Sequence, residues 1–168
     1  MNADEGSERR SHPDLEPEKW EGPPVGSAAE TDQWLLDLTS PDPAERADAA
    51  FVLGGSRRRR RRVIGALRSA LSDEDPVVVN FAAQSLGQLG DLESLPTIER
   101  LLSTGAPRDR SGPAWAVAAL AERGNEQDQA SARAALRAYR SRARGFSRGH
   151  AEALIARLQR GSSEPRSG

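Results

Sequence analysis

A stretch of the chain recurs at a fixed distance. The residues from Asp42 to Gly54 read DPAERADAAFVLG and are matched 33 positions later by Asp75 to Gly87, DPVVVNFAAQSLG. Asp, Pro, Ala, Ala, Leu and Gly fall at identical places in the two copies. A weaker third copy follows after 34 more residues, where Trp115 takes the place of Phe81. A fixed period of this size indicates a repeat array, in which each unit needs its neighbours to bury its apolar face.

The composition favours closely packed helices in the repeats. Aromatic residues make up only 4% of the chain, so a core has to be built mostly from Ala, Leu, Val and Ile. A β-sandwich would need more β-branched and aromatic residues. The absence of cysteine excludes a disulfide framework and thiolate metal sites. No apolar run is long enough to span a bilayer and no signal peptide is legible, which predicts a cytoplasmic protein without membrane contact.

Three segments follow from the composition along the chain. Residues 1–30 hold eight acids against three bases, with four prolines and three glycines. Such a segment cannot bury enough surface to offset chain entropy, so we expect a disordered acidic tail. Trp20 within it is either a docking anchor or simply an exposed tryptophan. Residues 31–161 are expected to form one repeat domain, and residues 162–168 a disordered C-terminal end.

The apolar spacing predicts four helix pairs. Asp42 can cap a helix that has Pro43 at its first position, with Glu45 placed to complete a capping box, and Gly54 stops that helix. The positions expected to face inward are Ala49, Ala50, Leu53, Ile64, Leu67, Leu71, Leu95, Ile98, Leu102, Leu136, Tyr139, Ala151, Leu154, Ile155 and Leu158. The expected segments are a short helix from Thr31, then 43–54, 63–71, 76–89, a helix carrying Leu95 to Leu102, 113–123, 127–144 and 148–160.

These residues resemble a known family. The stretch from Asp73 to Leu102, DEDPVVVNFAAQSLGQLGDLESLPTIERLL, is similar to HEAT repeats, in particular the short bacterial HEAT-like repeats also found in phycobilin lyase subunits. The family pattern is a D-x-D-P turn, a helix with A-A-x-x-L-G-x-L-G, an acidic turn and a second helix with spaced leucines. The resemblance is good over residues 31–125 and rests on helical pattern alone over 126–160.

The resemblance implies an all-α solenoid of about four helical hairpins. First helices would form the convex side and second helices the concave side, along which such proteins mostly bind other proteins. Family members use an arginine of the second helix in a ladder with the aspartate of a neighbouring turn. Val79 and Asn80 stand at the usual Val-Arg pair here, which leaves Arg46 to supply the ladder in the preceding unit.

Reactive groups are scarce, so we predict no enzyme. The chain has two histidines, His12 and His150, and neither is followed by the glutamate of a His-Glu iron pair. A thiol nucleophile is absent and no Ser-His-acid set is legible. His150 is expected to cap or pack at the start of the last helix. We therefore predict no catalytic residue, no metal site and no cofactor.

Six consecutive arginines are the sharpest local feature. They are Arg57, Arg58, Arg59, Arg60, Arg61 and Arg62. Successive helical residues step by about 100°, so six charges within a helix would surround it. We expect the run to be mostly loop and to enter a helix only at its end, near Val63. It is either a solvated turn that reflects an arginine-rich composition or an anion site. The anion would be nucleic acid phosphate, an acidic partner segment or the acidic tail of the chain itself.

A second basic stripe is expected on the first helix of the fourth pair. Its residues recur at helical spacing and are Arg133, Arg137, Arg140 and Arg144. They form either a solvated outer face of the terminal repeat or an extension of a surface for an anionic partner. A related hypothesis is that the acidic residues 4–21 fold over these arginines and compete with a partner.

The function predicted from the sequence is a non-enzymatic scaffold that binds an unidentified protein partner. One alternative is binding of nucleic acid or another polyanion through the arginine-rich surfaces. Another is an accessory role in a modifying enzyme, similar to a bilin lyase subunit. Steep loss of affinity with salt would indicate phosphate contacts and so favour the first alternative.

Overall fold

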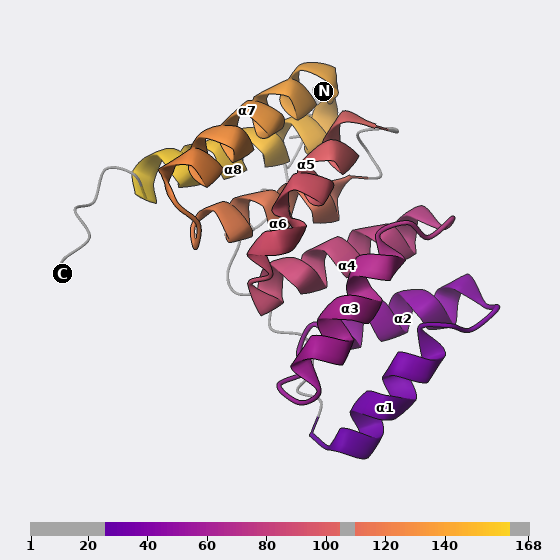
Figure 1. Ribbon diagram of the computed structural model, residues 1–168. Helices are drawn as coiled ribbons and strands as arrows, with labels where there is room; N and C mark the ends of the chain where they lie inside the picture. The colour runs from indigo at the N-terminus through magenta and orange to yellow at the C-terminus, as the bar shows by residue number, and fades with distance from the viewer. Residues whose placement is uncertain (1–25, 105–109, 162–168) are drawn as a thin grey trace, which may run out of the picture.

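The computed structural model describes residues 26–104 and 110–161, and the secondary structure of these ranges is helical (Figure 1). The all-α class predicted from the sequence is therefore confirmed. The elements are α1 (Ala28–Asp37), α2 (Pro43–Leu53), α3 (Arg60–Ala70), α4 (Pro76–Leu89), the 3-10 turn η1 (Leu92–Ser94), α5 (Leu95–Ser103), α6 (Ser111–Ala121), α7 (Glu126–Arg142) and α8 (Gly145–Gly161). The predictions for residues 1–25, Trp20 and His12 among them, and for 162–168 lie outside the described residues.

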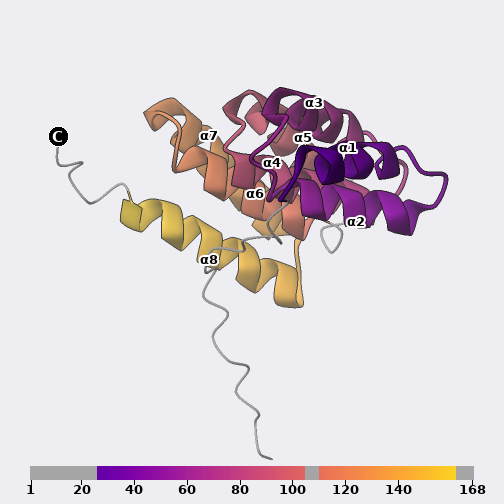
Figure 2. The ribbon, with the colours of Figure 1, turned by 90° about the horizontal axis from the view of Figure 1, so that it is seen from below.

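The helices form four consecutive hairpins that stack as a solenoid. Each odd-numbered helix packs on the even-numbered helix that follows it, and α2, α4, α6 and α8 pack on one another in that order. Figure 2 shows the two layers edge-on, with α1, α3 and α7 on one side and α2 and α8 on the other. This is the arrangement of first and second helices that the repeat predicted, and it confirms the solenoid.

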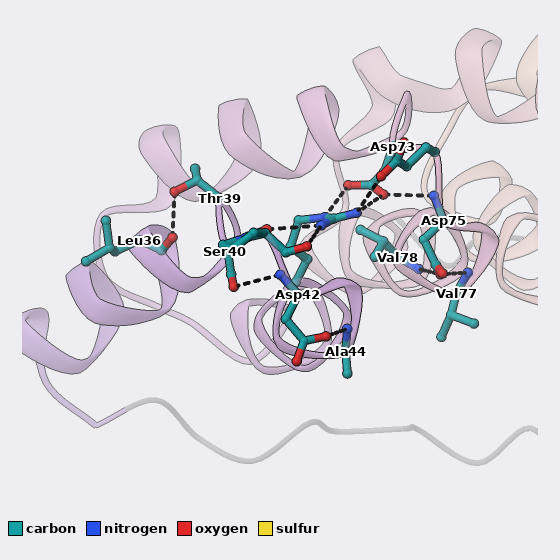
Figure 3. Close-up of polar contacts among 12 residues, drawn as sticks. Leu36, Thr39, Ser40, Asp42, Ala44, Asp73, Asp75, Val77 and Val78 are labelled. Atoms are coloured by element: carbon teal, nitrogen blue, oxygen red, sulfur yellow. Dashed lines mark hydrogen bonds and ion pairs between the residues drawn. The ribbon is translucent and has the colours of Figure 1, made fainter.

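The repeated Asp-Pro pair starts the second helices as expected. A side-chain oxygen of Asp42 accepts a hydrogen bond from the Ala44 N–H at 2.9 Å, and Asp75 accepts from the Val77 N–H at 2.8 Å. A proline occupies the first turn in both cases. Each cap satisfies a backbone donor that the helix itself leaves without an acceptor. Figure 3 shows both caps side by side.

The predicted capping box at Glu45 is wrong. Its carboxylate accepts a hydrogen bond from the Ser40 hydroxyl, and the Asp42 N–H donates to Ser40 Oγ at 3.1 Å. The next repeat is arranged in the same way, because the Asp75 N–H donates to Asp73 Oδ1 at 2.9 Å. In both repeats the side chain two positions before the cap accepts a hydrogen bond from the backbone N–H of the capping aspartate. In a capping box, that N–H would donate to the third residue of the helix.

Helices α1 and α8, like α3 described below, begin earlier than their apolar residues indicated. A capping box of Ser27 and Glu30 starts α1 at Ala28, whereas the apolar pattern begins after Thr31. The last helix starts at Gly145, where a φ of 52° suits glycine, and not at the expected position 148. The first turn of α1 contains Ala28 and Ala29 and that of α8 contains the exposed Phe146, so neither carries a large buried apolar side chain that would extend the hydrophobic pattern.

The predicted core is confirmed at nearly every position. The expected inward residues that are buried are Ala49, Ala50, Leu53, Leu67, Leu71, Leu95, Ile98, Leu102, Leu136, Tyr139, Ala151, Leu154, Ile155 and Leu158. Ile64 is only half-buried, and its neighbour Val63 is fully buried in its place. A shift of one residue along a helix turns the buried face by about 100°. The buried face of α3 therefore contains Val63 and Leu67.

The repeated glycine is required by the neighbouring helix. Gly54 has a φ of −60°, which any residue adopts, but an added Cβ would lie 2.5 Å from Ser85 Oγ on α4. Ser85 donates a hydrogen bond to the Ala50 carbonyl at 2.7 Å, which holds α2 and α4 together. A Cβ on Gly87, the same position one repeat later, would lie 3.0 Å from Ala116 Cα on α6. Glycine at this position lets successive second helices approach closely.

We predict that Ala83→Leu lowers the free energy of unfolding by about 1–3 kcal/mol, because overpacking a filled core forces side chains and backbone to shift. Ala83 is fully buried in the α4 layer. The matched control is Ala134→Leu on the exposed side of α7, which we expect to leave stability nearly unchanged. Urea denaturation followed by circular dichroism measures both, and equal midpoints for wild type and Ala83→Leu would contradict the packing described above.

Candidate partner-binding surfaces

Several arginines hold the repeats together and are therefore not available to a partner. Arg46 of α2 binds Asp73 through two hydrogen bonds, Nε to Oδ2 at 2.8 Å and Nη2 to Oδ1 at 2.9 Å. Its Nη1 also donates to the carbonyls of Ser40 and Pro41, so one side chain ties together the turns of two repeats (Figure 3). The hydrogen bond from Arg46 lowers the pKa of Asp73 against the opposing effect of burial. The ladder expected from the resemblance is thus present at Arg46.

Two further bidentate pairs were not foreseen from the sequence. Arg68 on α3 donates to Asp91, the buried residue after α4, with Nε 2.8 Å from Oδ2. Burial alone would raise the pKa of Asp91, but hydrogen bonds from Arg68 and Ser94 outweigh it and lower the pKa. Arg157 on α8 pairs in the same way with Glu122 at the end of α6. The two residues of these pairs are 23 and 35 positions apart in the chain. Local sequence patterns do not reveal contacts over such distances.

Other arginines cap the C-terminal ends of helices. Arg60 donates to the Leu89 carbonyl and Arg123 to that of Gln88, both at the end of α4. Arg142 donates to the Leu102 carbonyl near the end of α5. The last carbonyls of a helix receive no hydrogen bond from a backbone N–H of the same helix, and they carry partial negative charge. A guanidinium group at this end is therefore favourable. These side chains stabilise the solenoid.

The run from Arg57 to Arg62 divides between a turn and a helix. The expectation that it is mostly loop is wrong for its second half, because α3 begins at Arg60. Arg59 is the N-cap residue with a φ of 52°, and its guanidinium lies 2.9 Å from Asp32 of α1. Arg62 contacts the other oxygen of the same carboxylate at 3.0 Å. These contacts, with that of Arg60 to α4, offset the repulsion of cations by a helix N-terminus.

The three remaining arginines of the run are Arg57, Arg58 and Arg61, which we call the open arginines. All three are exposed, and their side chains make no hydrogen bond or ion pair with residues 26–104 or 110–161. The six-residue motif therefore combines structural and unpaired cations. The sequence could not separate them, because the difference depends on where Asp32 and the end of α4 lie in space.

The predicted basic stripe on α7 is only partly formed. Arg137 and Arg140 are exposed, whereas Arg133 is half-buried and contacts other residues. Arg144 lies beyond the end of the helix at Arg142 and so leaves the stripe. Two exposed arginines of one helix are ordinary for a polar outer face, and they do not by themselves indicate an anion site.

The exposed side of α2, α4 and α6, which we call the second-helix face, carries large apolar side chains on α4 and α6, whereas the equivalent position on α2 is Asp48. Phe81 and Trp115 occupy the same position in successive repeats and are half-buried, and Val77 one turn earlier is 49% exposed. The rings of Phe51 and Phe81 meet edge to face with centroids 5.3 Å apart. An apolar row that continues from α4 to α6 is a surface against which a partner can pack.

An acidic hollow of about 180 Å³ lies between α1 and α2. Its lining is Trp34, Asp37, Glu45 and Asp48. Three carboxylates repel an anion, so this hollow does not suit the anionic partners considered for the arginine-rich surfaces. The hollow is acidic, whereas the run from Arg57 to Arg62 is basic.

The described residues offer no legible catalytic or metal-binding set. Within residues 26–104 and 110–161, His, Cys, Asp and Glu side chains do not form a group of three or more that could hold a metal. His150 stacks on Phe146 with centroids 5.9 Å apart, and burial lowers its pKa while a backbone contact with Ser111 opposes the shift. It packs at the start of α8, as expected. Across the described helices, length and apolar character fall short of what a bilayer span needs.

Comparison with known proteins agrees with this architecture. The profile of HEAT repeats matches residues 31–121, which is more than half of the chain. The matched range runs from α1 to the end of α6 and so covers three of the four hairpins. Among curated proteins, none matches the sequence.

We predict that the paired carboxylates of Asp73 and Asp91 make the stability of the fold depend on pH in the acidic range. The pKa values of Asp73 and Asp91 are lowered in the fold, so their contribution is complete above their ordinary pKa of about 3.8 and is lost as pH falls through the lowered values. Urea midpoints between pH 6 and pH 2 should fall steeply for the wild type. They should fall less for Asp73→Asn with Asp91→Asn, which is already destabilised at pH 6.

The control for this experiment is Asp48→Asn, an exposed aspartate on α2 that forms no ion pair with the described residues. Its pH profile should follow that of the wild type. The same steepness in the doubly substituted protein would mean that other carboxyl groups carry the acid sensitivity.

Proposed function

Because this chain belongs to the HEAT-repeat family, we propose that it is a non-enzymatic scaffold that binds a protein partner along the second-helix face. HEAT repeats generally mediate protein interactions, and the family is generally without catalytic activity. Among the described residues, His, Asp and Glu side chains do not form a group of three or more that could hold a catalytic metal.

One observation carries the choice of surface. Val77 is half-exposed in the first turn of α4, one turn before the half-buried Phe81, and Trp115 occupies the position of Phe81 in the next repeat. These side chains lie on helices that the core holds in a fixed arrangement, so binding to them loses little conformational entropy. A partner that contributes an amphipathic helix or an extended apolar segment would bury this row.

Binding of a polyanion is the second candidate function, and the open arginines favour it. The guanidinium groups of the open arginines, which form no ion pair with the described residues, lie at the start of α3 and attract phosphate or carboxylate groups, most strongly at low salt. Aromatic side chains that would stack on bases do not interrupt the run, so this surface favours charge over base recognition. The accessory role in a modifying enzyme draws support only from the similarity of the repeats.

We predict that Val77→Glu weakens partner binding by about tenfold or more, which corresponds to ~1.4 kcal/mol. A carboxylate in the first turn of α4 suits the helix dipole, so the substitution should not weaken the fold. Affinity purification with quantitative mass spectrometry measures the recovery of each co-purified protein, and isothermal titration with the purified candidate then gives its affinity.

Leu36→Glu on α1 is the matched control, since Leu36 is 63% exposed and lies in the other layer. It should leave the partner bound. Loss of binding with Leu36→Glu but not with Val77→Glu would assign the interaction to the first helices. Recovery that falls steeply with salt and with substitution of the open arginines would favour the polyanion function.

A further inference from the structure

The open arginines lie in an environment that favours a bound anion. They flank the N-terminus of α3, where Arg59 provides no side-chain cap and the first backbone N–H groups find no acceptor among the described residues. These donors and the helix dipole add positive potential to that of the guanidinium groups. Within the described residues, the run has one carboxylate in hydrogen-bonding contact, that of Asp32, and two arginines already share it.

The start of the described chain is attached to this turn. The hydroxyl groups of Thr31 and Ser56 lie 3.3 Å apart in a buried contact, and Ser56 donates to the Arg58 carbonyl at 3.0 Å. Together with the Asp32 pairs, these contacts hold the first turn of α1 against the arginine run. Ser27, the cap of α1, accepts a hydrogen bond from the Thr31 hydroxyl through its carbonyl, so the described chain begins one helical turn from the contact with Ser56.

The segment that enters there has the complementary charge. Residues 4–21 contain seven acids and three bases, a net charge of −4. Four of the acids lie within 14–21 and are Asp14, Glu16, Glu18 and Glu21. Each extended residue spans at most about 3.6 Å, so the last of them can reach some 20 Å from position 26. A short tether gives such a segment an effective concentration of the order of millimolar at the arginine turn.

We propose that the acidic residues 14–21 dock in cis on Arg57, Arg58 and Arg61 at the N-terminus of α3. Their carboxylates then supply the anion that the uncapped helix end and the unpaired guanidinium groups favour. The docked segment occupies the surface that an external polyanion would need, so it limits the access of nucleic acid or acidic proteins to this turn. The inference is independent of binding at the second-helix face.

The test uses the full chain with a single spin label. Because the chain contains no cysteine, Ser11→Cys gives a unique attachment site beside the acidic segment. Paramagnetic broadening of backbone amide signals then reports which residues the segment approaches. We expect broadening at residues 56–62 in 50 mM salt and its loss in 500 mM salt, where exposed charges are screened.

Two sets of substitutions identify the contact. Arg57→Gln, Arg58→Gln and Arg61→Gln together should abolish the broadening at residues 56–62. Asp14→Asn, Glu16→Gln, Glu18→Gln and Glu21→Gln together should do the same. The matched control replaces three exposed arginines at the other end of the chain, Arg137→Gln, Arg140→Gln and Arg144→Gln, and should retain it. Broadening that survives the first set, or that never appears at residues 56–62, would overturn the proposal.

Access of a polyanion is a second, separate readout. If the segment is docked for about four-fifths of the time, neutralising its acids should tighten the binding of a 20-nucleotide single-stranded DNA about fivefold, because the competent fraction rises from about 0.2 to 1. Equal affinity before and after neutralisation, with the DNA contacting residues 56–62, would mean that the turn is an open nucleic-acid surface and not a site for the chain's own acidic segment.

Discussion

Close contact between successive second helices is the constraint on which the rest of the structure depends. Alanine and glycine at the repeated positions remove the side-chain bulk that would separate α2, α4 and α6, and Gly54 and Gly87 each face the next helix in the layer. The fixed spacing of these helices in turn fixes the turns at their ends. Those turns place Arg46 opposite Asp73 and Arg68 opposite Asp91, so the ion pairs form where helix packing has already brought the partners together.

The arginines of this chain divide into two groups, and the acceptors within their reach separate them. Guanidinium groups that reach an aspartate or the last carbonyls of a helix are part of the fold, and Arg46, Arg60 and Arg142 are examples. At the uncapped N-terminus of α3, Arg59 and Arg62 reach Asp32, whereas Arg57 and Arg58 have no partner among the described residues. An arginine-rich composition therefore does not by itself define a basic binding surface.

The two surfaces proposed for binding differ in chemistry and in position. The second-helix face is apolar around Val77 and belongs to the stacked layer of α2, α4 and α6. The arginine turn is cationic and lies where the chain enters the first hairpin. Apolar burial changes little with salt, whereas contacts between exposed charges weaken with it. Ionic strength therefore separates a partner on one surface from a partner on the other.

The repeat period, the helical class, the aspartate caps and the buried positions could all be predicted from the sequence. Each depends on residues a few positions apart, such as Asp42 and Ala44, or on apolar spacing along one helix. Only the tertiary structure decided where α3 starts, that the Ser40 hydroxyl donates to the Glu45 carboxylate, and why Gly54 is needed. It also decided which members of the arginine run find a partner among the described residues, because Asp32 and Leu89, which bind Arg59, Arg60 and Arg62, lie 27 to 30 residues away in the chain. Local patterns contain no information about such partners, since only the packing of helices brings them within hydrogen-bonding distance.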